Sequence, residues 1–154
     1  MTTDLKSSVN SLEWSPDGKS IAFTMTDPKT DDEEKSDKAK NDFRWVEENI
    51  KMSRLYLVPV AKDANGKREP RKLTAMNRSV TGFNWSSDGK TIVFNHVSPP
   101  SPNDWPSSDI ALVDVASGEV TPLAEQKNIA ESALYYSPDG KWISGIASDS
   151  PKWA

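Results

Sequence analysis

A hairpin motif that occurs three times constrains the fold of this chain more than any other feature of its sequence. The copies align without gaps and read LEWSPDGKSIAFT (residues 12–24), FNWSSDGKTIVFN (83–95) and LYYSPDGKWISGI (134–146). Each copy has an aromatic residue and a serine, followed by an Asp-Gly-Lys turn and a run of β-forming residues. Internal repetition of this kind is the sequence signature of repeat architectures, so we expect the fold to repeat one structural unit.

The unit is a β-hairpin, because the residue types at its turn suit a tight reversal of the chain. Proline at the second turn position, as in Pro16 and Pro138, presets φ for a type I turn, and aspartate suits the third position. Glycine then supplies the left-handed residue of a bulged hairpin. Beyond the turn, apolar residues recur with period two, which indicates a strand. Gly145 replaces a phenylalanine in the third copy, so we expect weaker packing there. The predicted structural turn residues are Asp17, Gly18, Asp88, Gly89, Asp139 and Gly140.

Two more predicted strands follow each of the first two hairpins. They are Leu55 to Val60 and Lys72 to Ala75 in the first repeat, and Ile110 to Val115 and Val120 to Leu123 in the second. Four antiparallel strands per repeat form one blade of a β-propeller. The sequence therefore predicts an all-β chain, a partial β-propeller of about two and a half four-stranded antiparallel blades. A β-sandwich also contains hairpins, but it has no reason to repeat one turn chemistry at blade spacing.

The spacing of the repeats locates a charged insert in the first blade. Trp85 and Tyr136 are 51 residues apart, whereas Trp14 and Trp85 are 71 apart. Known propeller repeats are roughly 40–50 residues long, so the first repeat carries the extra residues. The predicted organisation is the tail of a preceding blade and a connector at 1–10, a blade at 11–75 with the charged insert 27–51, a second blade at 76–124, and the first half of a third blade at 125–154.

Two and a half blades do not close a ring, since closed propellers have about 4–8 blades. The first residues, Met1 to Thr3, align with Leu73 to Ala75 at the end of a blade, which favours a piece of a larger propeller. Assembly of copies into a ring, with self-association through open blade edges, is the alternative. The expected partners in the first case are the remaining propeller blades.

Composition excludes several classes of function. The chain has 154 residues and no cysteine, which rules out disulfides, thiolate chemistry and a Cys-based zinc site. A formal charge of −4 gives no electrostatic reason to expect nucleic acid or a membrane as a partner. The first ten residues do not have the pattern of a signal peptide, and no apolar run approaches the roughly 20 residues of a membrane span. We predict a cytoplasmic location and no cofactor.

The repeats resemble the WD40-like (PD40) propeller repeat, which TolB-type proteins share with the propeller domain of prolyl oligopeptidase-family serine peptidases. The residues that carry the resemblance are 14–19, with counterparts at 85–90 and 136–141. Asn41 to Val58 further resembles a strand connection in acylaminoacyl-peptidase and dipeptidyl aminopeptidase relatives. The resemblance implies a non-catalytic segment of a serine peptidase that gates the access of short peptides to an α/β-hydrolase domain. A TolB-like interaction or scaffold propeller is the alternative.

The chain itself offers no catalytic, cofactor-binding or metal-binding residues. It has no Gly-x-Ser-x-Gly nucleophile elbow. His96 is the one histidine, and a Ser-His-Asp site needs all three groups within hydrogen-bonding reach. We expect His96 to be an ordinary residue at a strand end. Any hydrolase activity therefore belongs to a parent protein, predicted to be a serine peptidase.

The predicted substrate or partner face lies opposite the Asp-Gly-Lys turns and contains Trp45, Glu47, Glu48 and Trp105. By the resemblance, Glu47 and Glu48 correspond to paired glutamates that hold a peptide's amino terminus, although the pair here precedes a third strand rather than a first. A solvated charged surface is the alternative for the glutamates, and packing over the blade end is the alternative for Trp105. The acidic run at 31–34 lacks the pattern of a calcium loop and is expected to be a mobile, solvated loop.

Overall fold

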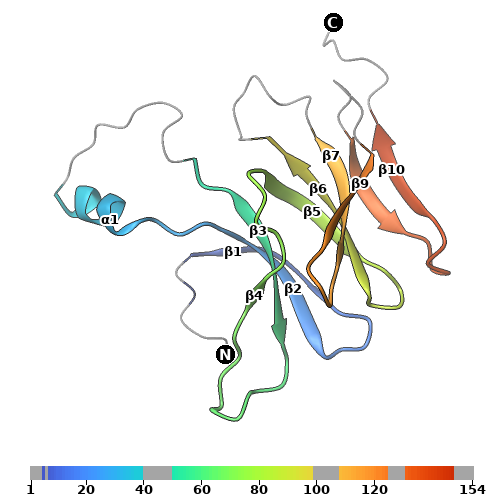
Figure 1. The fold of residues 1–154 in the computed structure, drawn as a ribbon, viewed down its shortest axis with the longest axis horizontal. Coiled ribbons are helices and arrows are strands. Elements are labelled where there is room, and N and C mark those ends of the chain that lie inside the picture. Colours follow the sequence, from blue (N-terminus) through green and yellow to red (C-terminus); the bar gives the residue numbers. More distant parts are fainter. Residues whose placement is uncertain (1–4, 6, 40–49, 99–107, 125–130, 148–154) are drawn as a thin grey trace, which may run out of the picture.

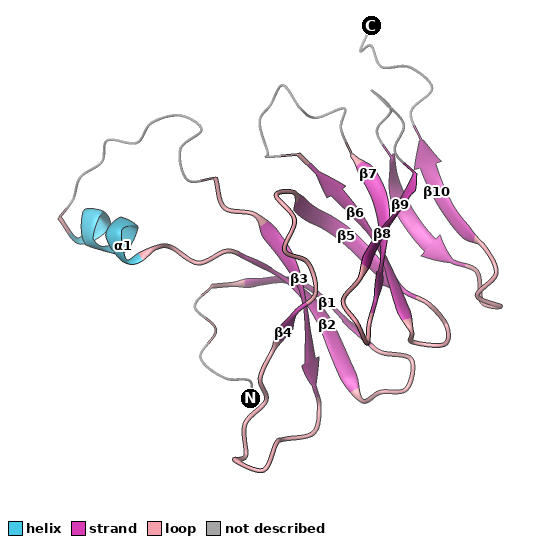
Figure 2. Ribbon diagram, viewed as in Figure 1, coloured by secondary structure: helices cyan, strands magenta, loops and turns pink. Residues whose placement is uncertain are grey.

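The described part of this computed structural model, which covers residues 5, 7–39, 50–98, 108–124 and 131–147, consists of three antiparallel sheets and one short helix (Figures 1 and 2). The first and second sheets have four strands each, hydrogen-bonded in sequence order, and the third is a hairpin. The first sheet contains β1 (Val9–Trp14), β2 (Ser20–Thr26), β3 (Ser53–Pro59) and β4 (Arg71–Lys72). The second contains β5 (Ser79–Trp85), β6 (Thr91–Val97), β7 (Asp109–Asp114) and β8 (Val120–Ala124). The third contains β9 (Glu131–Tyr136) and β10 (Ile143–Ala147).

This arrangement confirms the predicted fold class of repeated, antiparallel four-stranded sheets. In Figure 1 the three sheets lie side by side, and the three repeat turns are on the same side of the molecule. Each copy of the hairpin motif opens a separate sheet, as β1–β2, β5–β6 and β9–β10. No helix in the described part of the chain is long and apolar enough to cross a lipid bilayer.

The three turns share one hydrogen-bond pattern. In the first, the hydroxyl of Ser15 donates to Asp17 at 2.7 Å, and the same carboxylate accepts the amide of Lys19 at 3.0 Å. The amide of Ser20 donates to the Ser15 hydroxyl at 2.9 Å. Hydrogen bonds from the serine hydroxyl and the lysine amide lower the pKa of the aspartate in each copy. The equivalent glycines Gly18, Gly89 and Gly140 have φ of 68°, 69° and 70°.

The second sheet is packed on both of its faces. One face meets the first sheet in a cluster of buried residues that includes Leu55, Trp85 and Phe94. The other face meets the third hairpin through Val93, Ile110 and Leu134. Burying the strands of a sheet between two neighbours requires apolar residues on both faces, which explains the continuous apolar run in β6.

The first strands of successive sheets are also joined by polar contacts. The carboxylate of Glu13 in β1 accepts hydrogen bonds from the Trp85 amide and the Asn84 side chain in β5. Asn84 Oδ1 in turn accepts the amide of Tyr136 in β9 at 3.0 Å. At each step the residue before the aromatic of one copy binds the amide of the aromatic in the next copy. We call these two contacts the inner-strand rungs.

The fourth strand of the first blade is shorter than the predicted Lys72 to Ala75. Only Arg71 and Lys72 form ladder pairs with β3, although the Leu73 amide still donates to the Leu55 carbonyl at 2.8 Å. The reason is local, because the hydroxyl of Thr74 accepts the amide of Leu55 at 2.9 Å and so takes the place of a backbone carbonyl. Thr74 is completely buried, which makes this substitute hydrogen bond part of the core.

The prediction of a loop at residues 31–34 is wrong, because these residues begin the helix α1 (Asp31–Lys38). Thr30 caps the helix in a capping box with Glu33, whose carboxylate accepts the Thr30 amide at 2.6 Å. Acidic residues fill the first turn and lysines the last, which complements the helix dipole. Lys51 Nζ lies 2.6 Å from the Glu33 carboxylate, and this contact, more than the Thr30 amide, lowers the pKa of Glu33. The helix buries no residue and stands away from the sheets in Figure 1.

The turn geometry predicts the effect of adding a methyl group at two glycines. Gly89→Ala should lower the free energy of unfolding by about 1–2 kcal/mol, because alanine is strained at positive φ. Gly82→Ala is the matched control, since Gly82 has no positive φ and a Cβ there would lie 3.7 Å from Asn95 Oδ1, an ordinary contact. Urea denaturation of both variants measures the difference, and equal losses of stability would contradict the predicted turn strain.

Candidate functional site

Charged side chains gather at the ends of the sheets opposite the repeat turns. They come from strand ends and connections that are far apart in the chain but adjacent in the stacked sheets. We call this group the polar rim; its members are Asp27, Arg54, Lys72, Arg78, His96, Asp109 and Glu131.

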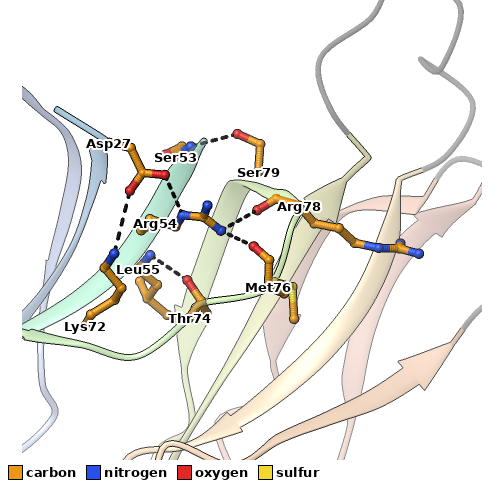
Figure 3. A network of polar contacts seen from close by, with 9 residues as sticks. All are labelled: Asp27, Ser53, Arg54, Leu55, Lys72, Thr74, Met76, Arg78 and Ser79. Atoms are coloured by element: carbon orange, nitrogen blue, oxygen red, sulfur yellow. Dashed lines mark hydrogen bonds and ion pairs between the residues drawn. The ribbon is translucent and has the colours of Figure 1, made fainter. Parts of the chain in front are cut away.

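Arg54 joins the first sheet to the segment that leads into β5 (Figure 3). Its Nε lies 2.9 Å from Asp27 Oδ2, and its Nη1 donates to the carbonyl oxygens of Met76 and, at 3.4 Å, of Arg78. The Arg54 side chain is only 11% exposed, so these contacts replace the water that the guanidinium loses. Lys72 Nζ lies 3.7 Å from the other oxygen of Asp27.

Arg78 continues the connection into the second sheet. Its main chain accepts from Arg54, while its side chain extends away from Arg54 in Figure 3. The Arg78 guanidinium forms an ion pair with Asp109 and lies 3.3 Å from His96 Nδ1. One arginine thus receives a hydrogen bond from the first sheet and donates to the second.

Glu131 forms the contact between the second sheet and β9. Its carbonyl oxygen accepts from Asn95 Nδ2 at 2.9 Å and from the Ser108 hydroxyl at 2.6 Å, and its amide donates to the Ser108 carbonyl at 3.0 Å. Glu131 is 5% exposed, and its carboxyl oxygen Oε2 is buried with no hydrogen-bond partner among the residues that the structure describes. Burial, and secondarily the negative charge of Asp109, raises the pKa of Glu131.

His96 has neighbours that the sequence did not reveal. It is buried in β6, its ring lies 5.6 Å from that of Phe94, and Asp109 is directly opposite in the ladder with β7. Nδ1 of His96, which faces the carboxylate in a Ser-His-Asp triad, here lies beside the Arg78 guanidinium. The arrangement around His96 is therefore that of an ion-pair cluster.

The four residues of the predicted substrate or partner face, Trp45, Glu47, Glu48 and Trp105, lie outside the described residues. Within the described ranges, no group of three or more histidine, aspartate or glutamate side chains is close enough to hold a metal ion. The acidic run at 31–34 belongs to α1, where its charges contribute to the helix cap and to ion pairs.

A cavity of about 580 Å³ opens between the second sheet and the third hairpin on the side of the repeat turns. Its apolar lining includes Leu112, Leu123 and Trp142, and its polar lining includes Thr91, whose hydroxyl lies 2.8 Å from that of Tyr136. Leu123 is 46% exposed and Trp142 is 73% exposed. The acidic groups that line the cavity are the turn aspartates, which are already engaged by serine hydroxyls and lysine amides. The cavity is an uncovered packing surface without a catalytic set.

Comparison with known proteins finds similarity in solved structures. TolB from Acinetobacter baumannii superposes with a TM-score of 0.50 and 21% identity, over 89% of this chain and 26% of that one. The fold is that of a β-propeller. A second TolB structure, from Agrobacterium tumefaciens, gives a TM-score of 0.44 and 21% identity, over 89% of this chain and 53% of that one. No family model matches the chain, and no curated protein matches it either.

These values bear on the fold and not on the activity. The chain spans about a quarter of the Acinetobacter TolB and about half of the Agrobacterium protein. The propeller fold expected from the resemblance to TolB-type repeats agrees with the superposition on the Acinetobacter structure. The finer resemblance to serine peptidases finds no support in them and stays a prediction.

The contacts that Arg54 makes between the first sheet and the segment before β5 predict that its side chain contributes strongly to stability. Arg54→Met keeps most of the side-chain volume but leaves Asp27 Oδ2 and two carbonyl groups without the donors that Arg54 provides, so we expect a loss of about 2–3 kcal/mol in the free energy of unfolding. Lys19→Met is the control, because the Lys19–Asp17 pair is solvent-exposed at 3.8 Å and such pairs contribute little. Urea denaturation measures the free energy of unfolding of both variants. A loss of stability in Arg54→Met no larger than in Lys19→Met would show that the connection between the sheets does not depend on the guanidinium.

Proposed function

We propose that this chain is a non-catalytic interaction or scaffold segment of a TolB-like propeller, which acts by binding neighbouring protein through its two outer sheet faces. The observation that carries the proposal is the contrast between two equivalent tryptophans. Trp85 is 7% exposed because the first sheet covers it, whereas Trp14, at the same position of the first hairpin, is 57% exposed. The same side chain thus serves as core in one sheet and as open surface in the next.

Large apolar residues are exposed on both outer faces. The first sheet presents Val9, Leu12 and Trp14, and the third hairpin presents Tyr135 and Ile146. Aromatic side chains contribute much of the binding energy in protein interfaces, and clustered exposed apolar residues mark such interfaces. The partner that suits these faces is another β-sheet with an apolar face, the kind of surface that the first and second sheets present to each other.

The polar rim supports the non-catalytic part of the proposal. Its arginines are paired with Asp27 and Asp109 and with main-chain carbonyls, which is the chemistry of a structural joint. The alternative, a segment that gates peptides in a serine peptidase, depends on Trp45, Glu47, Glu48 and Trp105, which lie outside the described residues. No contact in the described part of the chain favours that alternative.

Sedimentation velocity tests whether the outer faces bind protein. We expect the wild-type chain to self-associate reversibly between about 5 and 200 μM, because copies can cover each other's open faces. Trp14→Ser should weaken association by about tenfold or more, as removing a buried aromatic anchor does. Trp14→Phe is the matched control and should retain most of it.

The same experiment also tests the outer face of the third hairpin. Tyr135→Ser, on the opposite outer face, should also weaken association if the two faces pair head to tail. A wild-type chain that sediments as a monomer throughout the range, indistinguishable from Trp14→Ser, would contradict the role of these faces as binding surfaces.

A further inference from the structure

Glu131 departs from the pattern of the repeats at a core position. Counting from the repeat turns, its counterparts are Val9 in the first copy and Val80 in the second. Val80 is 3% exposed within the cluster between the first and second sheets, and Glu131 is 5% exposed at the next joint. The third copy therefore puts a carboxyl group where the second copy has a buried aliphatic side chain.

The backbone of Glu131 is held on both sides, which fixes where its side chain begins. Asn95 and Ser108 bind its carbonyl oxygen, and its amide binds the Ser108 carbonyl. Leu134 on the same strand packs against Val93 and Ile110 of the second sheet. The hairpin is thus docked at both a polar and an apolar point, and the carboxyl group of Glu131 lies inside that joint.

The charged and titratable groups around this joint come from several elements. Asp109 at the start of β7 is the negative charge that acts on Glu131. Arg78, from the segment before β5, and His96, in β6, form a cluster with Asp109. On β10, the residue paired with Glu131 is Ala147, which brings no charge. The Arg78 guanidinium is paired with Asp109, and Glu131 Oε2 has no hydrogen-bond partner among the described residues.

A negative charge on Glu131 is unfavourable in such a place for two reasons. Burial of Oε2 removes part of the water that would stabilise the charge, and Asp109 brings a second negative charge. A protonated carboxyl group avoids both costs. The proton is therefore bound more tightly when the hairpin is docked than when the joint is open.

We propose that Glu131 is a proton switch at the joint between the second sheet and the β9–β10 hairpin, and that protonation of its carboxyl group tightens the docking of the hairpin. The hairpin carries Tyr135 and Ile146, so the switch controls how firmly one outer face is held. The proposal goes beyond the proposed function, because the joint is internal to the chain and its opening is measured without any partner.

The direction of the pH dependence follows from the raised pKa of Glu131 in the docked state. The stabilising effect of the proton is fully present below the ordinary glutamate pKa of about 4.3. It is lost as the pH rises from there through the raised pKa of the docked state. A single group can change the opening equilibrium by at most about tenfold per pH unit in this window.

Hydrogen–deuterium exchange of the full chain tests the switch. Protection factors, corrected for the intrinsic exchange rate at each pH, are measured from pH 4.5 to 7.5 for peptides that cover residues 131–147. We expect the wild-type protection of β9 and β10 to fall by up to about tenfold per pH unit relative to that of Glu131→Gln. The ratio of the two proteins removes the contributions of other titrating groups.

Two further variants and one reference segment of the same chain test whether the pH effect is specific to Glu131 and to this joint. Glu131→Val restores the residue of the other repeats, so its hairpin should be more protected than wild type at pH 7.5, and this excess should vanish toward pH 4.5. Glu119→Gln removes an exposed carboxyl group from the connection between β7 and β8 and should behave as wild type. In peptides covering residues 9–26, where Val9 takes the equivalent position, the ratio of wild-type to Glu131→Gln protection should stay constant, because both proteins keep Glu13, whose pKa burial also raises.

Two outcomes would overturn the proposal. A ratio of wild-type to Glu131→Gln protection that is constant over the pH range would show that the carboxyl group is not linked to docking. An equal change in residues 9–26 and 131–147 would show that the proton acts on global stability and not on this joint. If Glu131→Gln does not fold, the comparison with Glu131→Val gives the same two outcomes.

Discussion

The rest of the structure depends on the burial of the second sheet between two neighbours. Ile92, Val93 and Phe94 are completely buried, and they alternate between the cluster shared with the first sheet and the cluster shared with the third hairpin. A sheet with one neighbouring sheet needs one apolar face, whereas a sheet between two neighbours needs two. The outer sheets have only one described neighbour each, which is why Trp14 is exposed while Trp85 is core. The proposed function follows from this single difference.

Apolar packing is not directional, so polar contacts are needed to fix how the sheets align. The inner-strand rungs, from Glu13 to the Trp85 amide and from Asn84 to the Tyr136 amide, set the alignment along the inner strands. The polar rim does the same at the ends opposite the turns, where Arg54 and Arg78 join successive sheets. Glu131 is the exception, since its carboxyl oxygen Oε2 is buried without a hydrogen-bond partner among the described residues.

Features that neighbouring residues determine could be predicted from the sequence, whereas contacts between distant residues could not. The turns and most strands follow from neighbouring residues, so they were predictable. The loop expected at 31–34 is a helix because Thr30 and Glu33 form a capping box, a local signal that the sequence contains within the charged run. The polar rim brings together residues such as Arg78 and Asp109, 31 positions apart, which no local pattern reveals. Glu131 could have been found, because alignment of the repeats places it opposite two valines.

The central claim is that each repeat opens its own sheet and that the sheets stack against one another. Nuclear Overhauser contacts in the full chain test it directly. We expect contacts from the Trp85 indole to the side chains of Leu55 and Leu73, together with cross-strand backbone contacts within each sheet only. Cross-strand backbone contacts that pair β1 with β5 in one continuous ladder, or an indole without contacts to the first sheet, would contradict it.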